Sequence, residues 1–310
     1  MYNFISIVKV VLLSITLFSF HGITFSQTFS AKGQLVVSGL TSNDIPDNWS
    51  SFESIIGYIP TLSLAKEVSI DKLFDAEWAY YLKRYYAGDS LFNYSENNHR
   101  FWVRYSSEKI EARLGLQKIV FGPTQILRPL SWFDTFDLKD PTGQTDGVES
   151  FRLRWFPSNG ISVWSWLVNN DVDTLSYGGR AEITSSIGEF GFTYHQTPEN
   201  SIQYIGQPGI PFYGSHNRIG VDFRFDGFIG LWNENVLIKS DESKLGLITV
   251  GADYTIPVAN GFLVMTESMY IYNKDNNLNS DQTYSVFMAS LPIGMIHQIM
   301  YISQVDWKED

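Results

Sequence analysis

The sequence predicts an all-β protein, an antiparallel transmembrane β-barrel of about 14 to 16 strands. Apolar residues recur with a period of two in segment after segment from Phe29 onward, which is typical of strands with two different faces. Many of these segments are longer than the strands of soluble proteins. Aromatic residues make up 15% of the chain and charged residues only 18%, as expected for a barrel with aromatic girdles. A soluble, aromatic-rich β-sandwich has a similar composition, so composition alone leaves both classes open.

Residues 1 to 26 are predicted to form a secretory signal peptide, and residues 27 to 310 the barrel domain. Lys9 precedes an apolar run over 10 to 20, which is followed by Gly22 and a small residue at Ser26. The run has about 11 residues, too few for the roughly 20 that a membrane-spanning helix needs. We expect cleavage near Ser26 and a mature chain that is either soluble outside the cytoplasm or crosses a membrane as strands.

About fifteen strands are predicted from the alternation, most of them about nine to thirteen residues long, whereas a tilted membrane strand needs about nine to eleven. They cover 31 to 40, 55 to 66, 73 to 86, 98 to 107, 109 to 119, 148 to 157, 161 to 169, 177 to 187, 189 to 197, 216 to 227, 228 to 240, 244 to 256, 261 to 273, 282 to 291 and 295 to 307. Tight turns alternate with longer polar loops at 120 to 147, 198 to 215 and 273 to 281, which fits the two rims of an outer-membrane barrel.

The polar faces of the strands carry arginines and carboxylates that are candidates to line a pore. In 216 to 227, for example, Ile219 and Val221 lie on one face and Arg218 and Asp222 on the other. Guanidinium groups in a lumen would attract anionic solutes. The alternative is a ladder of cross-strand ion pairs that only braces the wall. The pore-lining candidates are Arg104, Glu111, Arg113, Arg152, Arg154, Arg180, Glu182, Arg218, Asp222 and Arg224.

Residues 113 to 143 contain a strand with Gly-x-Gln, then Phe-Gly, then a loop rich in Pro and Asp. This segment of about thirty residues resembles the alginate-export-like group of bacterial outer-membrane porins, a β-barrel family. The resemblance implies a single-chain barrel whose long loop after this strand narrows the pore; an extracellular loop is the alternative. The matching positions are Gly115, Gln117, Gly122, Pro129, Phe133, Asp137 and Asp140, and the constriction-loop candidates are Arg128, Asp134, Asp137 and Asp140.

Two features depart from this family pattern. Bacterial barrels of this kind have an even number of strands, whereas the pattern predicts an odd number. The chain ends in Lys308-Glu309-Asp310 instead of an aromatic residue. Either the predicted count is off by one strand or the barrel is incomplete at the C-terminus.

Several other functions are not expected. The net charge of −11 and the lack of a basic run argue against nucleic acid as a partner. With no cysteine, disulfides, thiolate metal sites and a lipid-modified Cys are excluded. The acidic residues of the 120 to 147 loop do not have the spacing of a calcium loop, so no metal or cofactor is predicted. His99, His195, His216 and His297 lie outside any recognisable catalytic motif, so we expect no enzyme activity.

The sequence therefore predicts an exported protein of a Gram-negative outer membrane that contacts lipid and lets small hydrophilic solutes diffuse through, with a preference for anions as a hypothesis. An exported carbohydrate-binding β-sandwich and a closed structural or adhesin barrel are the alternatives. The solute and the oligomeric state are not predicted.

Overall fold

The computed structural model describes residues 27–41, 50–134, 144–170, 174–198, 202–205, 210–241, 243–258, 260–275, 278–294 and 297–307. The predicted signal peptide over 1 to 26 and the loop residues Asp137 and Asp140 lie outside these ranges. The chain divides into two compact units. Unit 1 comprises Met1–Ile119 and Phe133–Leu153, and unit 2 comprises Val120–Trp132 and Arg154–Asp310.

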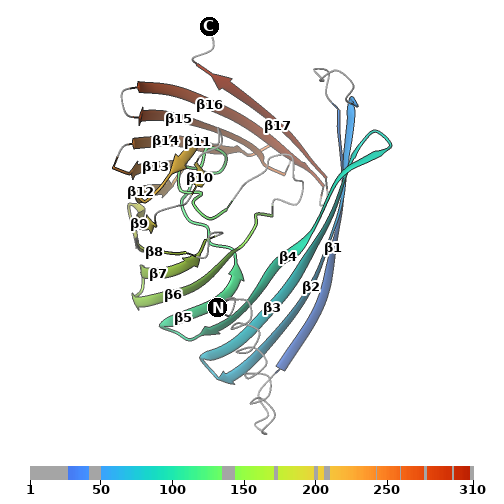
Figure 1. Cartoon of the computed structure of the whole chain (residues 1–310), viewed down its shortest axis with the longest axis vertical. Helices are drawn as coiled ribbons and strands as arrows, with labels where there is room; N and C mark the ends of the chain where they lie inside the picture. Colours follow the sequence, from blue (N-terminus) through green and yellow to red (C-terminus); the bar gives the residue numbers. More distant parts are fainter. Residues whose placement is uncertain are drawn as a thin grey trace. The chain divides into compact units, whose positions relative to one another are not determined.

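The described residues of unit 1 form long antiparallel strands that pair in chain order, and Figure 1 shows them in blue to green. These strands are β1 (Gln27–Thr41), β2 (Phe52–Ser69), β3 (Lys72–Ala87), β4 (Ser90–Ser106), β5 (Ile110–Gln117) and the first half of β6 (Val148–Ser158). Short connections at 70–71, 88–89 and 107–109 join β2 to β3, β3 to β4 and β4 to β5. Ile59, Ala79 and Tyr81 form a small buried apolar cluster on this part of the sheet.

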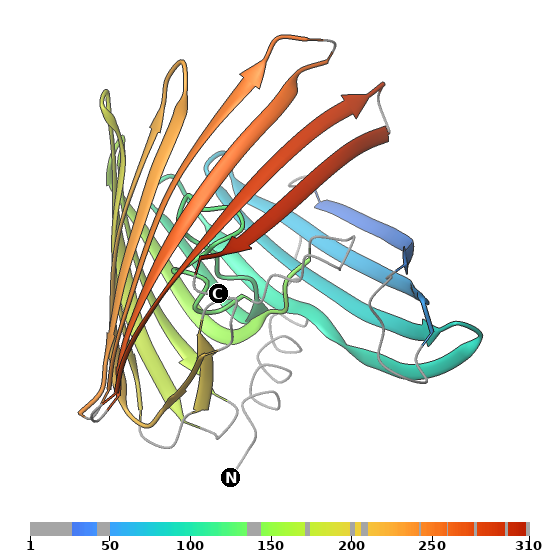
Figure 2. The same cartoon turned by 90° about the horizontal axis from the view of Figure 1, so that it is seen from above.

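The strands of unit 2 begin within β6, at Arg154, and lie side by side in Figure 2. Its long strands are β7 (Ile161–Asn169), β8 (Leu175–Ser185), β9 (Gly188–Thr197), β12 (His216–Asp226), β13 (Gly230–Lys239), β14 (Ser243–Ile256), β15 (Phe262–Asp275), β16 (Leu278–Ile293) and β17 (His297–Asp306). Between β9 and β12 in sequence are two short strands, β10 (Ile202–Ile205) and β11 (Ile210–Tyr213), which form an antiparallel pair separate from the main sheet in the described part of the chain.

The predicted all-β fold is confirmed. The main sheet has 15 strands, and each corresponds to a predicted segment. The largest difference in extent is at β4, which begins at Ser90 instead of at residue 98; β1, β2 and β16 also begin a few residues earlier than predicted. The short β10–β11 hairpin was not predicted, because two four-residue strands within a polar loop carry too few residues to show a period. Among the described residues, no helix is long and apolar enough to span a membrane.

The two faces of the sheet in unit 2 differ sharply. In β12, His216, Arg218 and Asp222 are buried, whereas Ile219 and Val221 are exposed. We call the face with the buried side chains the inner face and the opposite one the outer face. The outer face carries large exposed apolar side chains on almost every strand, including Leu167, Phe192, Val221, Leu231 and Val250. An apolar surface of this extent is stable only against another apolar medium.

Candidate functional site

The inner face of unit 2 is covered by a segment of its own chain. Val120–Trp132, which we call the inner segment, follows β5 in sequence and contains no regular helix or strand. Five of its large apolar side chains are less than 10% exposed: Phe121, Ile126, Leu127, Leu130 and Trp132. The described part of the predicted constriction loop thus lies against the sheet instead of extending away from it.

Aromatic contacts bring the two ends of the inner segment together and fix them on the sheet. The ring of Phe121 stacks on that of Trp166 from β7, with centroids 5.5 Å apart. Trp132 meets Phe121 edge-on at 5.7 Å and lies 6.2 Å from the ring of His195 on β9. Contacts of this geometry add to the free energy gained by burying the rings.

Glu267 on β15 fixes the middle of the inner segment. Its side chain is fully buried between Met265 and Met269, and its two oxygens accept four hydrogen bonds. Oε1 accepts from the backbone N–H of Gln125 at 2.7 Å and from the indole of Trp232 at 3.1 Å. Oε2 accepts from the backbone N–H of Ile126 at 3.0 Å and of Leu127 at 2.7 Å. Three successive backbone donors thus surround one carboxylate, as in an anion-binding nest.

Glu234 on β13 holds the segment at two further points. Its Oε1 accepts from the backbone N–H of Thr124 at 2.8 Å, and its Oε2 from that of Leu130 at 3.2 Å. The side chain is 1% exposed. A buried carboxylate is stable only when its oxygens are hydrogen-bonded, so the inner segment and the two glutamates stabilise each other.

Glycines of the inner segment and of the sheet make this close approach possible. Gly122 has a φ of +92°, and a Cβ at this position would lie 2.2 Å from Oε1 of Glu234. On the sheet, a Cβ at Gly220 would lie 2.5 Å from Leu130, so Gly220 leaves the hollow that seats this leucine.

We expect Gly122→Ala to destabilise the folded chain by about 1 to 3 kcal/mol, because alanine is strained at positive φ and would displace the Glu234 carboxylate. The measurement is the urea concentration at which the chain unfolds in detergent. Gly214→Ala is the matched control, since Gly214 also has a positive φ (+77°) but nothing lies within 4 Å of its Cβ position. Equal losses in the two variants would show that backbone strain alone is responsible and that the contact with Glu234 is not.

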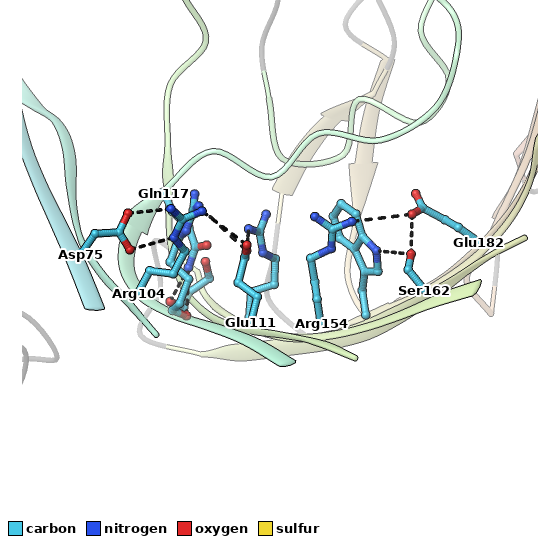
Figure 3. Close-up of polar contacts among 11 residues, drawn as sticks. Asp75, Arg104, Glu111, Gln117, Arg154, Ser162 and Glu182 are labelled. Atoms are coloured by element: carbon cyan, nitrogen blue, oxygen red, sulfur yellow. Dashed lines mark hydrogen bonds and ion pairs between the residues drawn. The ribbon is translucent and has the colours of Figure 1, made fainter. Parts of the chain in front are cut away.

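In unit 1, three of the predicted arginines gather around two carboxylates. Arg104 on β4 donates two hydrogen bonds to Asp75 on β3, at 2.8 and 2.6 Å, as Figure 3 shows. Glu111 on β5 accepts from Arg152 at 2.7 Å and lies 3.4 Å from Arg104. Arg113 is only loosely paired, with 3.9 Å to Glu111, and its guanidinium stacks on the ring of Trp102 at 4.3 Å.

In unit 2, Arg180 on β8 is the centre of a second cluster. It makes two hydrogen bonds to Asp222 on β12, at 2.6 and 2.9 Å, and one to Glu182 at 2.8 Å. Glu182 also accepts from Ser162 at 2.6 Å, a contact drawn in Figure 3. Arg154 is the loosely paired member, 4.0 Å from Glu182, with its guanidinium 4.0 Å from the ring centre of Trp164.

The remaining predicted residues have different surroundings. Arg218 is 2% exposed and donates to the imidazole of His216, with no carboxylate within ion-pair distance among the described side chains. Arg224 pairs with the exposed Asp226 at 3.0 Å. Arg128 is half-buried within the inner segment, and Asp134 is buried within unit 1. His195 is buried on the inner face, as the alternation predicts, where its Nδ1 accepts from the indole of Trp166.

Glu234 and Glu267 were not among the predicted site residues. Both occupy inner-face positions whose neighbours on the same face are apolar. Glu234 lies between Trp232 and Val236, and Glu267 lies between Met265 and Met269. A single carboxylate in an apolar row indicates a bound donor group, because a lone buried charge is unstable. This pattern is visible in the sequence, although the identity of the donor is not.

The chain was compared with known proteins at three levels. No protein-family model and no curated protein sequence matches it. Among solved structures, it is similar to OmpF of Salmonella typhi, with 11% identity, coverage of 90% of both chains and a TM-score of 0.58. The alignment with the outer-membrane protein OmpT of Vibrio cholerae has 8% identity, covers 91% of this chain and 89% of the OmpT chain, and gives a TM-score of 0.58. The alignment with the anion-selective porin from Comamonas acidovorans has 11% identity, covers 87% of this chain and 85% of the porin chain, and gives a TM-score of 0.53. At these identities the likeness shows the fold, which is the antiparallel β-barrel of outer-membrane porins.

Proposed function

We propose that this chain is an outer-membrane channel for the passive diffusion of small hydrophilic solutes and that the inner segment narrows its pore. The observation that carries the proposal is the attachment of Val120–Trp132 to the inner face by Glu234 and Glu267. A segment held there by five backbone hydrogen bonds keeps one position while solutes pass. The porin fold and the apolar outer face support the membrane location.

The proposal includes export through removal of residues 1 to 26, a role without catalysis and a barrel domain over 27 to 310. Membership of the alginate-export-like group remains a finer prediction, which rests on the segment 113 to 143. The carbohydrate-binding sandwich is disfavoured, because its apolar side chains would face inward and its exposed face would be polar.

The channel itself is tested by inserting purified, folded protein into planar lipid bilayers. We expect discrete conductance steps at nanomolar protein concentration. Folded protein that inserts but never conducts would contradict the channel and favour a closed structural or adhesin barrel.

Arg113 and Arg154 are the two predicted pore residues best placed to meet a solute. Their nearest carboxylates are 3.9 and 4.0 Å away, whereas Arg104, Arg152 and Arg180 are held in shorter pairs. A guanidinium stacked on an aromatic ring keeps its edge available for a carboxylate or phosphate. We infer that these two residues, and not the whole set, give the channel a preference for anions.

We expect Arg113→Gln with Arg154→Gln to shift the reversal potential in a salt gradient toward cation preference, because two positive charges leave the pore. Arg84→Gln is the control, since Arg84 lies on the opposite face of β3 from Asp75 and pairs with Glu96. Unchanged reversal potential in the double variant would contradict a selective role and leave the ion pairs as a brace for the wall.

A further inference from the structure

The outer face of unit 2 has a groove where β12 to β15 lie side by side. The groove has a volume of 380 Å³ and is lined mainly by apolar atoms. Among its lining residues are Ile219, Leu237, Lys244, Gly246, Ile248 and Tyr270. Gly246 pairs with Leu237 on one side and with Tyr272 on the other, so the missing side chain of Gly246 forms the floor of the groove.

A row of three lysines lies at one end of this groove. Lys239 on β13 is directly opposite Lys244 on β14, and Lys244 is directly opposite Lys274 on β15. Residues directly opposite each other in antiparallel strands point to the same face, and the alternation places all three on the outer face. All three are exposed, and Lys244 lines the groove itself.

This arrangement is electrostatically unfavourable by itself. Neighbouring strands are about 4.8 Å apart, so the backbone positions of the three lysines span roughly 10 Å across three strands. Like charges directly opposite each other destabilise a sheet. Among the described side chains, no ion pair joins any of the three lysines to a carboxylate. Four acidic residues are near the row in sequence or in strand register. Asp241 and Glu242 follow β13 in sequence, Asp275 is opposite Ser243, and Asp281 is opposite Tyr272, so neither of the two aspartates on the strands is directly opposite a lysine.

We propose that the lysine row and the groove together bind one phosphorylated lipid, with its phosphate among Lys239, Lys244 and Lys274 and an acyl chain along Gly246. The charge of the row matches an anionic headgroup, and the apolar groove begins at the same lysine. The row lies at the strand ends that also carry the long 198–215 connection. In outer-membrane barrels long loops are extracellular, so the lipid belongs to the outer leaflet. The inference rests on the proposed membrane location and not on channel activity.

Two variants separate the two halves of the site. Replacing all three lysines with glutamine removes the positive charge, whereas Gly246→Leu fills the groove. A Cβ at position 246 would have Tyr272 as its nearest neighbour, at 3.9 Å, which is ordinary van der Waals contact. Gly246→Leu is therefore expected to fold. Folding is checked by gel electrophoresis: the unheated variant should migrate as fast as unheated wild type, and heating should slow both. The control for charge is Lys32, Lys72 and Lys109 to Gln, three other exposed lysines.

The experiment is native mass spectrometry of detergent-purified full-length chain titrated with three probes: diphosphorylated lipid A, the same lipid without phosphates, and inorganic phosphate. We expect wild type and the charge control to retain diphosphorylated lipid A at least tenfold more strongly than the phosphate-free lipid, and inorganic phosphate not to be retained. Both site variants should lose this retention at least tenfold while their bilayer conductance stays as in wild type.

Equal retention in wild type and in the lysine triple variant would overturn the proposal, as would equal retention of the two lipids. Unchanged retention in Gly246→Leu, or retention of inorganic phosphate alone, would contradict the proposal that an acyl chain occupies the groove. Lipid binding that fails while conductance persists contradicts only this inference, whereas folded protein that does not insert into bilayers contradicts the proposed function.

Discussion

Glu267→Gln is expected to free the inner segment from the sheet and to raise the single-channel conductance. Glutamine keeps one acceptor oxygen but replaces the other with an NH₂ group, which cannot accept a hydrogen bond. Two of the four donors around Glu267, from Gln125, Ile126, Leu127 and Trp232, then lose their acceptor. Each buried donor left unsatisfied costs about 1 to 3 kcal/mol, so the loss of two acceptors weakens the attachment by roughly 2 to 6 kcal/mol.

Hydrogen exchange provides a readout that does not depend on conduction. In wild type, the amides of Gln125, Ile126 and Leu127 are hydrogen-bonded to a fully buried carboxylate and should exchange slowly. In Glu267→Gln they should exchange at least tenfold faster, while the amides within β13 and β14 keep their protection. Bilayer recordings of the same sample should show larger and more variable conductance steps.

Glu96→Gln is the matched control for this variant. Glu96 pairs with Arg84 at 2.6 Å, but both side chains are more than a third exposed, and such pairs contribute at most about 1 kcal/mol. We expect no change in exchange or conductance there. If Glu267→Gln also leaves both readouts unchanged, the two glutamates do not hold the inner segment and the proposed constriction loses its main support.

The strands could be predicted from sequence because their signal is local. Buried and exposed residues alternate strictly over eight positions in β7 and over seven in β12, and the hydropathy pattern shows the same alternation. The pattern also gives the correct face for Arg180, Arg218 and Asp222. It does not give the strand ends, because β4 and β16 extend into polar stretches such as 90–97 and 278–281 where the hydropathy no longer alternates.

The attachment of the inner segment could not be predicted in the same way. Glu267 and Gln125 are separated by 142 residues, and backbone N–H groups are present in every loop. Sequence therefore shows that Glu267 needs a donor but not which loop supplies it. The same applies to Glu234. Its partners are the backbone N–H groups of Thr124 and Leu130, and only the folded structure distinguishes these from the N–H groups of other loop residues.

The ion pairs fall between these two cases. Alternation places Arg180 and Asp222 on one face, and each is on a strand next to β9. The direct contact across β9 depends on Gly191, because a Cβ there would lie 2.2 Å from Nη2 of Arg180 and 2.3 Å from Oδ2 of Asp222. The sequence predicts that inner-face carboxylates pair with arginines. That Asp222 pairs with Arg180 depends on Gly191, whose role is visible only in the folded structure.

Asp222→Asn is expected to produce the second large effect, a loss of about 3 to 5 kcal/mol in the free energy of unfolding. The side chains of Arg180 and Asp222 are 5% and 7% exposed, and two hydrogen bonds of 2.6 and 2.9 Å join them. Asparagine has nearly the same shape but no charge, and its NH₂ group would face a guanidinium that also only donates. Glu182 and Thr193 still accept from Arg180, so the expected loss lies toward the lower end of this range.

Asp226→Asn on the same strand makes the same chemical change at an exposed pair. Asp226 is 63% exposed and its partner Arg224 33%, so we expect a loss below about 1 kcal/mol. Urea unfolding of both variants in detergent, followed by tryptophan fluorescence, measures the difference. Both variants remove one charge, and the two sites differ mainly in burial. Equal losses of unfolding free energy in Asp222→Asn and Asp226→Asn would therefore show that Arg180 is solvated in the folded chain. That result would place a water-filled space next to Asp222 and make Arg180, together with Arg154, a residue that a passing solute can reach.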